Sequence, residues 1–175
     1  MVPARHRWLL VLAVTLGPVI LALALQWQHW ERKQRLQHVP AAWGVDTILF
    51  ADGMTLGDGP GGAWNGVTVY ALPDAAAKDI AAGGLAYLEN MPRQGVTAHR
   101  DAPEHYDGWR QGAGFVSLDD FLCLYDSCLT LSREVRSMIN AVFDSPDSYV
   151  ATSRSGTIVL SPARQRVVYL YRKCC

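Results

Sequence analysis

The polar and aromatic side chains that could do chemistry are concentrated in one stretch, residues 92–118. Most of this stretch shows neither helical nor strand periodicity, and loops of this length in compact domains often carry function. His99 and His105 could act as general acid or general base toward a substrate, with Asp107 or Asp101 as the carboxylate partner of His105. We therefore name His99, His105 and Asp107 as candidate catalytic residues, against the simpler interpretation of a solvated ionic loop.

Sequence motifs give little support to catalysis. The sequence contains no G-x-S-x-G, H-E-x-x-H, Walker or S-x-x-K motif. Two imidazoles and two thiolates could bind zinc, but the spacing of His99, His105, Cys123 and Cys128 fits no standard zinc finger. We therefore predict no metal and no cofactor. A small envelope enzyme, hydrolytic or thiol-dependent and using residues 99–110, is the alternative function.

The four cysteines suggest an oxidising environment. We expect Cys123 and Cys128 to form a disulfide, because an even number of cysteines in an exported domain indicates bridges and this one closes a small loop. A bridge between Cys174 and Cys175 would be strained, so their roles stay open. Four unpaired thiols are the alternative if the domain lies in a reducing compartment.

Aromatic and arginine side chains in the same long stretch favour binding over catalysis. Trp, Tyr and Arg dominate the binding energy of many protein interfaces. We therefore predict a recognition surface formed by Tyr106, Trp109 and Arg110, with Trp64 as a further binding residue. Trp64 could instead cap the core.

A glycine-rich segment, residues 53–66, contains a formal match to a nucleotide-binding motif. Gly57, Gly59 and Gly62 match G-x-G-x-x-G, which binds a dinucleotide only when a helix follows it. A strand-like run, residues 67–71, follows here instead. We therefore interpret the segment as a wide hairpin loop.

The elements that must position these residues indicate an α+β fold. We expect helices over residues 72–90 and 132–143, the second with Ser132 as N-cap, and strands over residues 45–51, 67–71, 149–153, 157–161 and 167–171. Because helices and strands do not alternate regularly, we expect a mainly antiparallel sheet of about five strands covered by two helices. The last strand is apolar on both faces and should be central.

The N-terminal segment predicts a membrane anchor. Residues 8–25 contain no ionisable side chain and, as a helix, would span roughly 27 Å, close to the hydrocarbon thickness of a bilayer. Trp8 at one end and Trp27 and Trp30 at the other are suited to the membrane interface. We therefore expect residues 1–40 to form a single-pass anchor, with a span over about residues 8–27 and a polar helical stalk.

Two alternatives compete with this anchor. A secretory signal peptide would be cleaved near Ala24, although its apolar run would normally be shorter. A buried helix of a soluble protein would normally show a polar face. The anchor and the signal peptide both export residues 41–175, which are sufficient for one domain.

The charge distribution limits the partners. Residues 1–40 carry five Lys/Arg and one Glu, whereas residues 41–175 carry eleven Lys/Arg and fifteen Asp/Glu. Nucleic-acid binding needs clustered positive charge, so we expect a lipid bilayer and a protein partner but no nucleic acid. The excess of arginine over lysine suggests a bacterial source. We expect a protein of the bacterial inner membrane whose extracytoplasmic domain binds an envelope protein, as an inhibitor, an immunity-type protein or an accessory assembly component.

Overall fold

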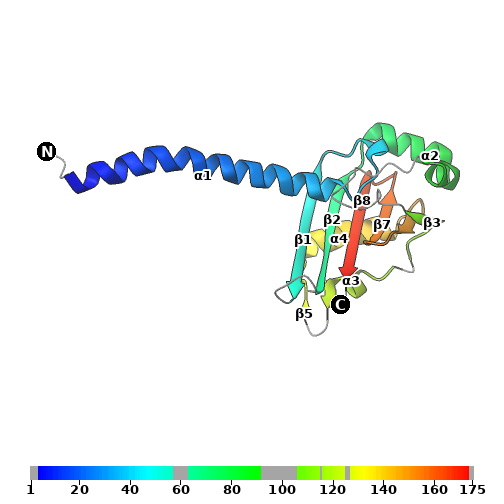
Figure 1. The fold of residues 1–175 in the computed structure, drawn as a ribbon. Coiled ribbons are helices and arrows are strands. Elements are labelled where there is room, and N and C mark those ends of the chain that lie inside the picture. Colours follow the sequence, from blue (N-terminus) through cyan, green and yellow to red (C-terminus); the bar gives the residue numbers. More distant parts are fainter. Residues whose placement is uncertain (1–3, 57–62, 92–105, 115, 125–126, 174–175) are drawn as a thin grey trace. The chain divides into compact units, whose positions relative to one another are not determined.

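The chain folds into two compact units, Met1–Arg35 and Leu36–Cys175. The structure is a computed structural model that describes residues 4–56, 63–91, 106–114, 116–124 and 127–173, with only the backbone described at residues 4–16, 56 and 173. The first unit is helical, and the second is an α+β domain (Figure 1). The predicted α+β class is confirmed.

Helix α1 (Ala4–Leu36) continues through Pro18 and past the apolar run. The charged part that follows is stabilised by an ion pair one turn apart, in which Arg35 donates to Glu31 over 2.8 Å. Trp27 and Trp30 lie tilted against each other, with ring centroids 5.4 Å apart. A continuous helix from the apolar run into the polar segment is what the sequence predicted.

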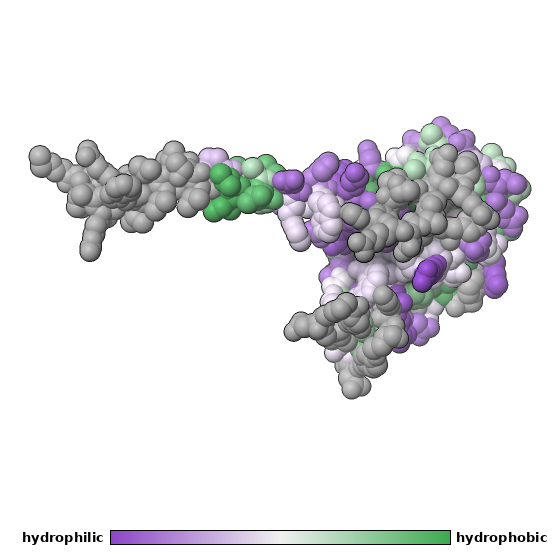
Figure 2. Space-filling model, in the orientation of Figure 1, coloured by the Kyte–Doolittle hydropathy of each residue, from purple (hydrophilic) through white to green (hydrophobic). Residues whose placement is uncertain are grey.

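Large apolar side chains of α1 are exposed, as the described part of the helix in Figure 2 shows. Between 51% and 65% of each is accessible in Val19, Ile20, Leu21, Leu23, Leu25, Trp27 and Trp30. In the part of the chain that the structure describes, no helix combines the length and apolarity needed to cross a membrane. The span expected over residues 8–27 thus has no support from the structure, and its first side chains, Trp8 included, lie outside the described part.

A six-stranded antiparallel sheet forms the centre of the domain, in the order β1-β2-β8-β7-β6-β3. Its strands are β1 (Ile48–Leu56), β2 (Ala63–Ala71), β3 (Asp107–Gln111), β6 (Tyr149–Thr152), β7 (Thr157–Ser161) and β8 (Arg166–Lys173). The three strands expected near the C-terminal end of the sequence pair in succession as an antiparallel β6-β7-β8 meander. The central place of β8, between β2 and β7, is confirmed.

Helices cover both faces of this sheet, which explains why β8 is apolar on both sides. Helix α2 (Asp74–Glu89) contributes to one core together with Tyr70, Val167 and Tyr169, and we call this side the α2 face. Helices α3 (Leu118–Leu122) and α4 (Arg133–Phe143) contribute to the other core, which contains Val67, Val69, Val159, Val168 and Leu170; this is the α4 face. Apolar residues in successive positions of β8 therefore fill two separate cores.

Several short elements were not predicted. The one-turn helix η1 (Ala41–Trp43) places the Trp43 ring in the core of the α2 face. The sixth strand, β3, forms within the stretch that we had interpreted as a long loop. A separate hairpin pairs β4 (Cys123–Leu124) with β5 (Ser127–Cys128). Gly57, Gly59 and Gly62 lie outside the described residues, while the β1-β2 pairing on either side of them confirms the predicted hairpin.

Local sequence signals explain how α4 begins and why α2 bends. The Ser132 hydroxyl accepts a hydrogen bond from the Val135 N–H over 3.3 Å, which confirms the predicted N-cap of α4. In α2, Gly84 adopts φ +55°, a conformation that other residues rarely adopt. The helix α2 is therefore kinked at Gly84.

A carboxylate ties the turn after α4 to the β7-β8 turn. Asp147 accepts hydrogen bonds from the hydroxyls of Ser145 and Ser161, the latter over 2.8 Å, and from the Ala163 N–H over 2.7 Å. Partial burial raises the pKa of the Asp147 carboxyl, but these hydrogen bonds to the charged form outweigh it, and the net pKa lies below the usual value of 3.8. The charged carboxylate is therefore the form that the fold stabilises.

Replacing Asp147 with asparagine should weaken this link. We expect the free energy of unfolding at pH 7 to fall by about 1 kcal/mol, since the half-exposed site is partly screened by solvent. Because the folded pKa is lowered, the stabilisation is present above pH 3.8 and disappears as the pH falls through the folded pKa. Urea unfolding of wild type and Asp147→Asn across this pH range measures it. A difference that is unchanged or larger in acid would contradict the assignment.

Candidate functional site

A row of four rings crosses the α2 face near the β1 edge of the sheet. The Trp64 and Tyr171 rings have centroids 5.1 Å apart, Tyr171 and Tyr169 are 5.8 Å apart, and His38 stacks on Tyr169 at 4.4 Å. Trp64, Tyr171 and His38 are half-buried, whereas Tyr169 is fully buried. We call these four residues the aromatic row; it presents three partly accessible rings held by one buried ring.

The register of β2 against β8 builds this row. Gly66 lies opposite Tyr171 and Thr68 opposite Tyr169, so Trp64, two residues before Gly66, lies diagonally next to Tyr171. Diagonal neighbours on one face are within reach of aromatic side chains. His38 reaches the row from the segment just after α1, and its carbonyl oxygen accepts a hydrogen bond from the Tyr106 hydroxyl over 2.6 Å.

A pair of glycines makes room for Tyr171. Gly53 of β1 pairs with Gly66 of β2, and Gly66 pairs with Tyr171 of β8. A Cβ atom at either glycine would collide with the Tyr171 hydroxyl. The Tyr171 side chain therefore lies flat across both glycines, toward β1.

The buried ring of the row, Tyr169, is fixed by hydrogen bonding. The Tyr169 and Ser155 hydroxyl oxygens are 2.8 Å apart, and the Ser155 N–H donates to the Ser153 hydroxyl over 3.3 Å. These serines belong to the turn between β6 and β7, which Gly156 completes close to the Tyr169 ring. The residues that hold Tyr169 in place thus all come from one turn.

The predicted binding residues separate into two groups. Trp64 is half-buried and belongs to the aromatic row, as a surface binding residue would. Tyr106 and Trp109 are 8% and 6% exposed and belong to the core of the α2 face, where the Trp109 ring meets Trp43 edge-on at 6.1 Å. The expectation of an exposed surface at Tyr106 and Trp109 is therefore corrected. Arg110, on the same strand, is exposed.

The candidate catalytic residues are not assembled in the described structure. Asp107 is exposed at the start of β3, while His99 and His105 lie outside the described residues. An open depression of about 420 Å³ lies elsewhere, along α4, and its lining includes Arg133, Arg136, Asn140 and Asp144. Asp107 is not among the residues that line this depression.

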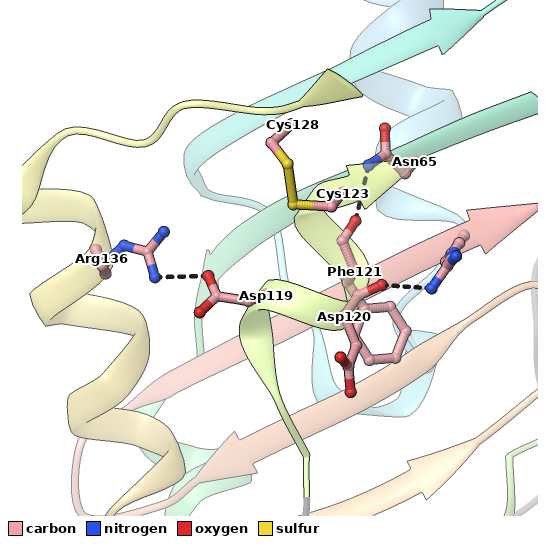
Figure 3. The surroundings of a disulfide bond; sticks show 8 residues. Asn65, Asp119, Asp120, Phe121, Cys123, Cys128 and Arg136 are labelled. Carbon is pink, nitrogen blue, oxygen red and sulfur yellow. Dashed lines mark hydrogen bonds and ion pairs between the residues drawn. A yellow bond between two sulfur atoms is a disulfide. The ribbon is translucent and has the colours of Figure 1, made fainter. Parts of the chain in front are cut away.

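Cys123 and Cys128 lie opposite each other in the β4-β5 hairpin and are joined by a disulfide (Figure 3). The predicted bridge is present. It occupies both sulfurs that a zinc site would need as thiolates. Among the residues described, no three His, Cys, Asp or Glu side chains are grouped so that they could hold a metal ion.

The segment before this hairpin is tied to three other elements, as Figure 3 shows for β2 and α4. The Asn65 side-chain amide donates to the Phe121 carbonyl over 2.9 Å, and Arg172 donates to the Asp120 carbonyl over 2.9 Å. Arg136 of α4 pairs with Asp119 over 2.8 Å. The Asn65 Oδ1 is buried without a hydrogen-bond partner among the described residues. These contacts fix α3 and the disulfide hairpin on the α4 face, opposite the aromatic row.

No known protein family, curated protein or solved structure matches this chain. The geometry of its own residues is therefore the basis for any functional proposal. Sequence analysis found Trp64 but missed Tyr171, Tyr169 and His38. The alternating tyrosines of β8 were the available signal, but their register against Trp64 decides that they share a surface.

Proposed function

We propose that this protein is a membrane-anchored envelope protein whose domain binds a protein partner through the aromatic row. The observation that carries the proposal is the set of partly accessible rings of Trp64, Tyr171 and His38 on the α2 face. Tryptophan and tyrosine present large, rigid surfaces and dominate many interfaces. Identifying the partner decides whether it is a target to be inhibited or a component of an envelope assembly.

The anchor is inferred from the uncharged sequence of residues 8–25, since no described helix meets the requirements of a membrane span; the exposed apolar side chains of α1 are compatible with it. Val19, Ile20 and Leu21 are consecutive, so on a helix they point in three different directions, and each is more than half exposed. A helix that is apolar all round is buried in a protein core or in a bilayer. With the uncharged sequence of residues 8–25, this favours insertion of α1 in the bacterial inner membrane, with the domain outside the cytoplasm.

The anchor predicts the behaviour of the full chain in cell fractions. We expect the intact chain to stay in the membrane pellet after washing at high pH, because the apolar residues of α1 bind the bilayer. Immunoblotting and N-terminal sequencing of both fractions measure this. A soluble chain that begins just after Ala24 would instead establish the cleaved signal peptide.

The partner-binding proposal is tested by replacing Trp64 with alanine. We expect affinity for the captured partner to fall at least about tenfold, as is usual when a central aromatic side chain of an interface is removed. Crosslinking of the full chain in its native membranes, followed by affinity capture and mass spectrometry, identifies the partner, and titration of the purified pair gives the affinity.

Tyr87→Ala is the matched control, because Tyr87 is also a half-buried aromatic residue but lies on α2. Partner affinity should be unchanged in this variant. Circular dichroism melting of both variants separates loss of binding from loss of folding. Equal affinity of Trp64→Ala and wild type, with both folded, would remove the aromatic row from the binding site.

A further inference from the structure

The two edge strands of the sheet differ in how open they are. Strand β3 has only five residues, and a bulge between Asp107 and Arg110, with Gly108 at φ +66°, interrupts its pairing with β6. Strand β1 has nine residues, contains no proline or lysine, and pairs with β2 along its length apart from one irregularity near Leu49. Among the described strands, none pairs with the outer side of β1. Natural sheets usually protect an edge of this length.

Hydrogen bonding shows which residues of β1 face outward. The Gly53 N–H donates to the Asp52 carboxylate over 2.8 Å, and we therefore place it on the side of β1 that faces away from β2. Because backbone groups alternate between the two sides of a strand, Ala51 and Thr55 direct their N–H and C=O groups to the same outer side as Gly53. Asp52 and Met54 direct theirs to β2. The outer edge thus offers the backbone N–H and C=O groups of Ala51 and Thr55 for pairing. Between them, the Gly53 N–H is hydrogen-bonded to the Asp52 carboxylate.

The side chains beside this edge define what could pair with it. Gly53 pairs with Gly66 under Tyr171, and Thr55 pairs with Trp64, so these β1 positions lie on the α2 face beside the aromatic row. Asp52, the only ionisable residue of β1, lies on the opposite face. A segment added to β1 would therefore meet aromatic surface on one face and negative charge on the other.

We infer that β1 binds an extended segment of the partner protein as an additional strand, with apolar residues toward the aromatic row and a lysine or arginine toward Asp52. This inference rests on the proposed partner binding and specifies its mode. A basic side chain that pairs with the Asp52 carboxylate also frees the Gly53 N–H, which can then donate a hydrogen bond to the added strand. Backbone pairing supplies affinity and the alternating side chains supply specificity, as in other strand-addition complexes.

Charge argues for this occupant over a second copy of the chain. Two β1 strands paired with each other would add no positive charge and would bring both Asp52 carboxylates to one face of the joined sheet. A basic partner segment has the opposite effect, because it neutralises Asp52. The oligomeric state of the free protein is therefore measured first, by light scattering of the full chain in detergent.

The test uses the full chain and synthetic peptides of nine residues. The probe is acetyl-Val-Lys-Val-Thr-Tyr-Thr-Val-Lys-Val-amide, and its matched control has both lysines replaced by glutamate. We expect the lysine peptide to bind at least about fivefold more tightly than the glutamate peptide, by fluorescence anisotropy. In Asp52→Lys this preference should reverse, whereas the same change on α2, Asp79→Lys, should leave it unchanged.

Two further measurements examine the backbone ladder itself. Amide hydrogen exchange by NMR should slow at Ala51 and Thr55 when the lysine peptide is bound. Two further peptides carry N-methyl groups on alternate residues, one along the backbone edge that would face β1 and the other along the opposite edge. The first should lose about tenfold in affinity, and the second should not.

The outcomes separate this inference from the proposed function. Binding that perturbs Trp64 and Tyr171 without protecting the β1 amides would overturn strand addition and leave the aromatic row as the binding site. Failure of all the peptides, with Trp64-dependent partner capture intact, would also overturn it. A dimer of the free protein that protects the same amides would assign β1 to self-association instead.

Discussion

Replacing Trp109 with alanine is expected to lower the free energy of unfolding of the domain by about 3 to 5 kcal/mol, the cost of removing a large aromatic side chain from a packed core. Only 6% of Trp109 is exposed. Its ring contacts Trp43 at 6.1 Å and Tyr106 at 6.2 Å between centroids, so the cavity would open between η1 and the β3 edge. Urea unfolding followed by far-ultraviolet circular dichroism measures the loss.

Arg110→Ala is the control for this experiment, because Arg110 is the next residue of β3 and is exposed. Its effect on stability should stay within about 1 kcal/mol. If Trp109→Ala were equally mild and yet abolished partner capture, Trp109 would be a surface binding residue, contrary to its placement in the core.

A second large effect is expected from Gly66→Ala, although it adds only one methyl group. The new Cβ would lie 2.6 Å from the Asp52 carbonyl oxygen and would also collide with the Tyr171 hydroxyl. Tyr171 can rotate away, but the Asp52 carbonyl belongs to the backbone of the paired strand. We therefore expect a loss of about 2 to 3 kcal/mol in the free energy of unfolding.

Gly114→Ala is the matched control, since nothing lies within 4 Å of a Cβ atom at that position. It should leave stability nearly unchanged. Thermal melts of both variants decide the matter: equal melting temperatures would show that β1 and β2 can separate at Gly53 and Gly66 without cost. In Gly66→Ala we also expect the Tyr171 ring to leave Trp64, which is visible as a change in tryptophan fluorescence.

The elements that could be predicted are those whose signals are local. The strands at residues 157–161 and 167–171 are dense in β-branched and aromatic residues, and Ser132 caps α4 through its own side chain. The sequence Asp-Gly-Trp-Arg-Gln of β3 has no such density, and it is a strand because β6 offers a free edge. Such a strand depends on distant pairing that no short window contains.

The site was harder to predict for the same reason. Trp109 is flanked by polar residues and glycine, which is typical of an exposed segment, yet on an edge strand only one of the five residues needs to face the core. Trp64 and Tyr171 are neighbours only because β2 pairs with β8 in one particular register. A shift of one residue would place them on opposite faces.

The central position of β8 also sets an order for biosynthesis. Of the six strands of the described sheet, β8 follows the other five in the chain, and it lies between the β1-β2 hairpin and the strands β7, β6 and β3. Until it emerges, these two pieces have no common ladder, and the two cores lack Val167, Val168, Tyr169 and Leu170. Such non-local pairing slows folding. While folding waits for β8, the apolar residues of β1 and β2 stay uncovered and are open to aggregation.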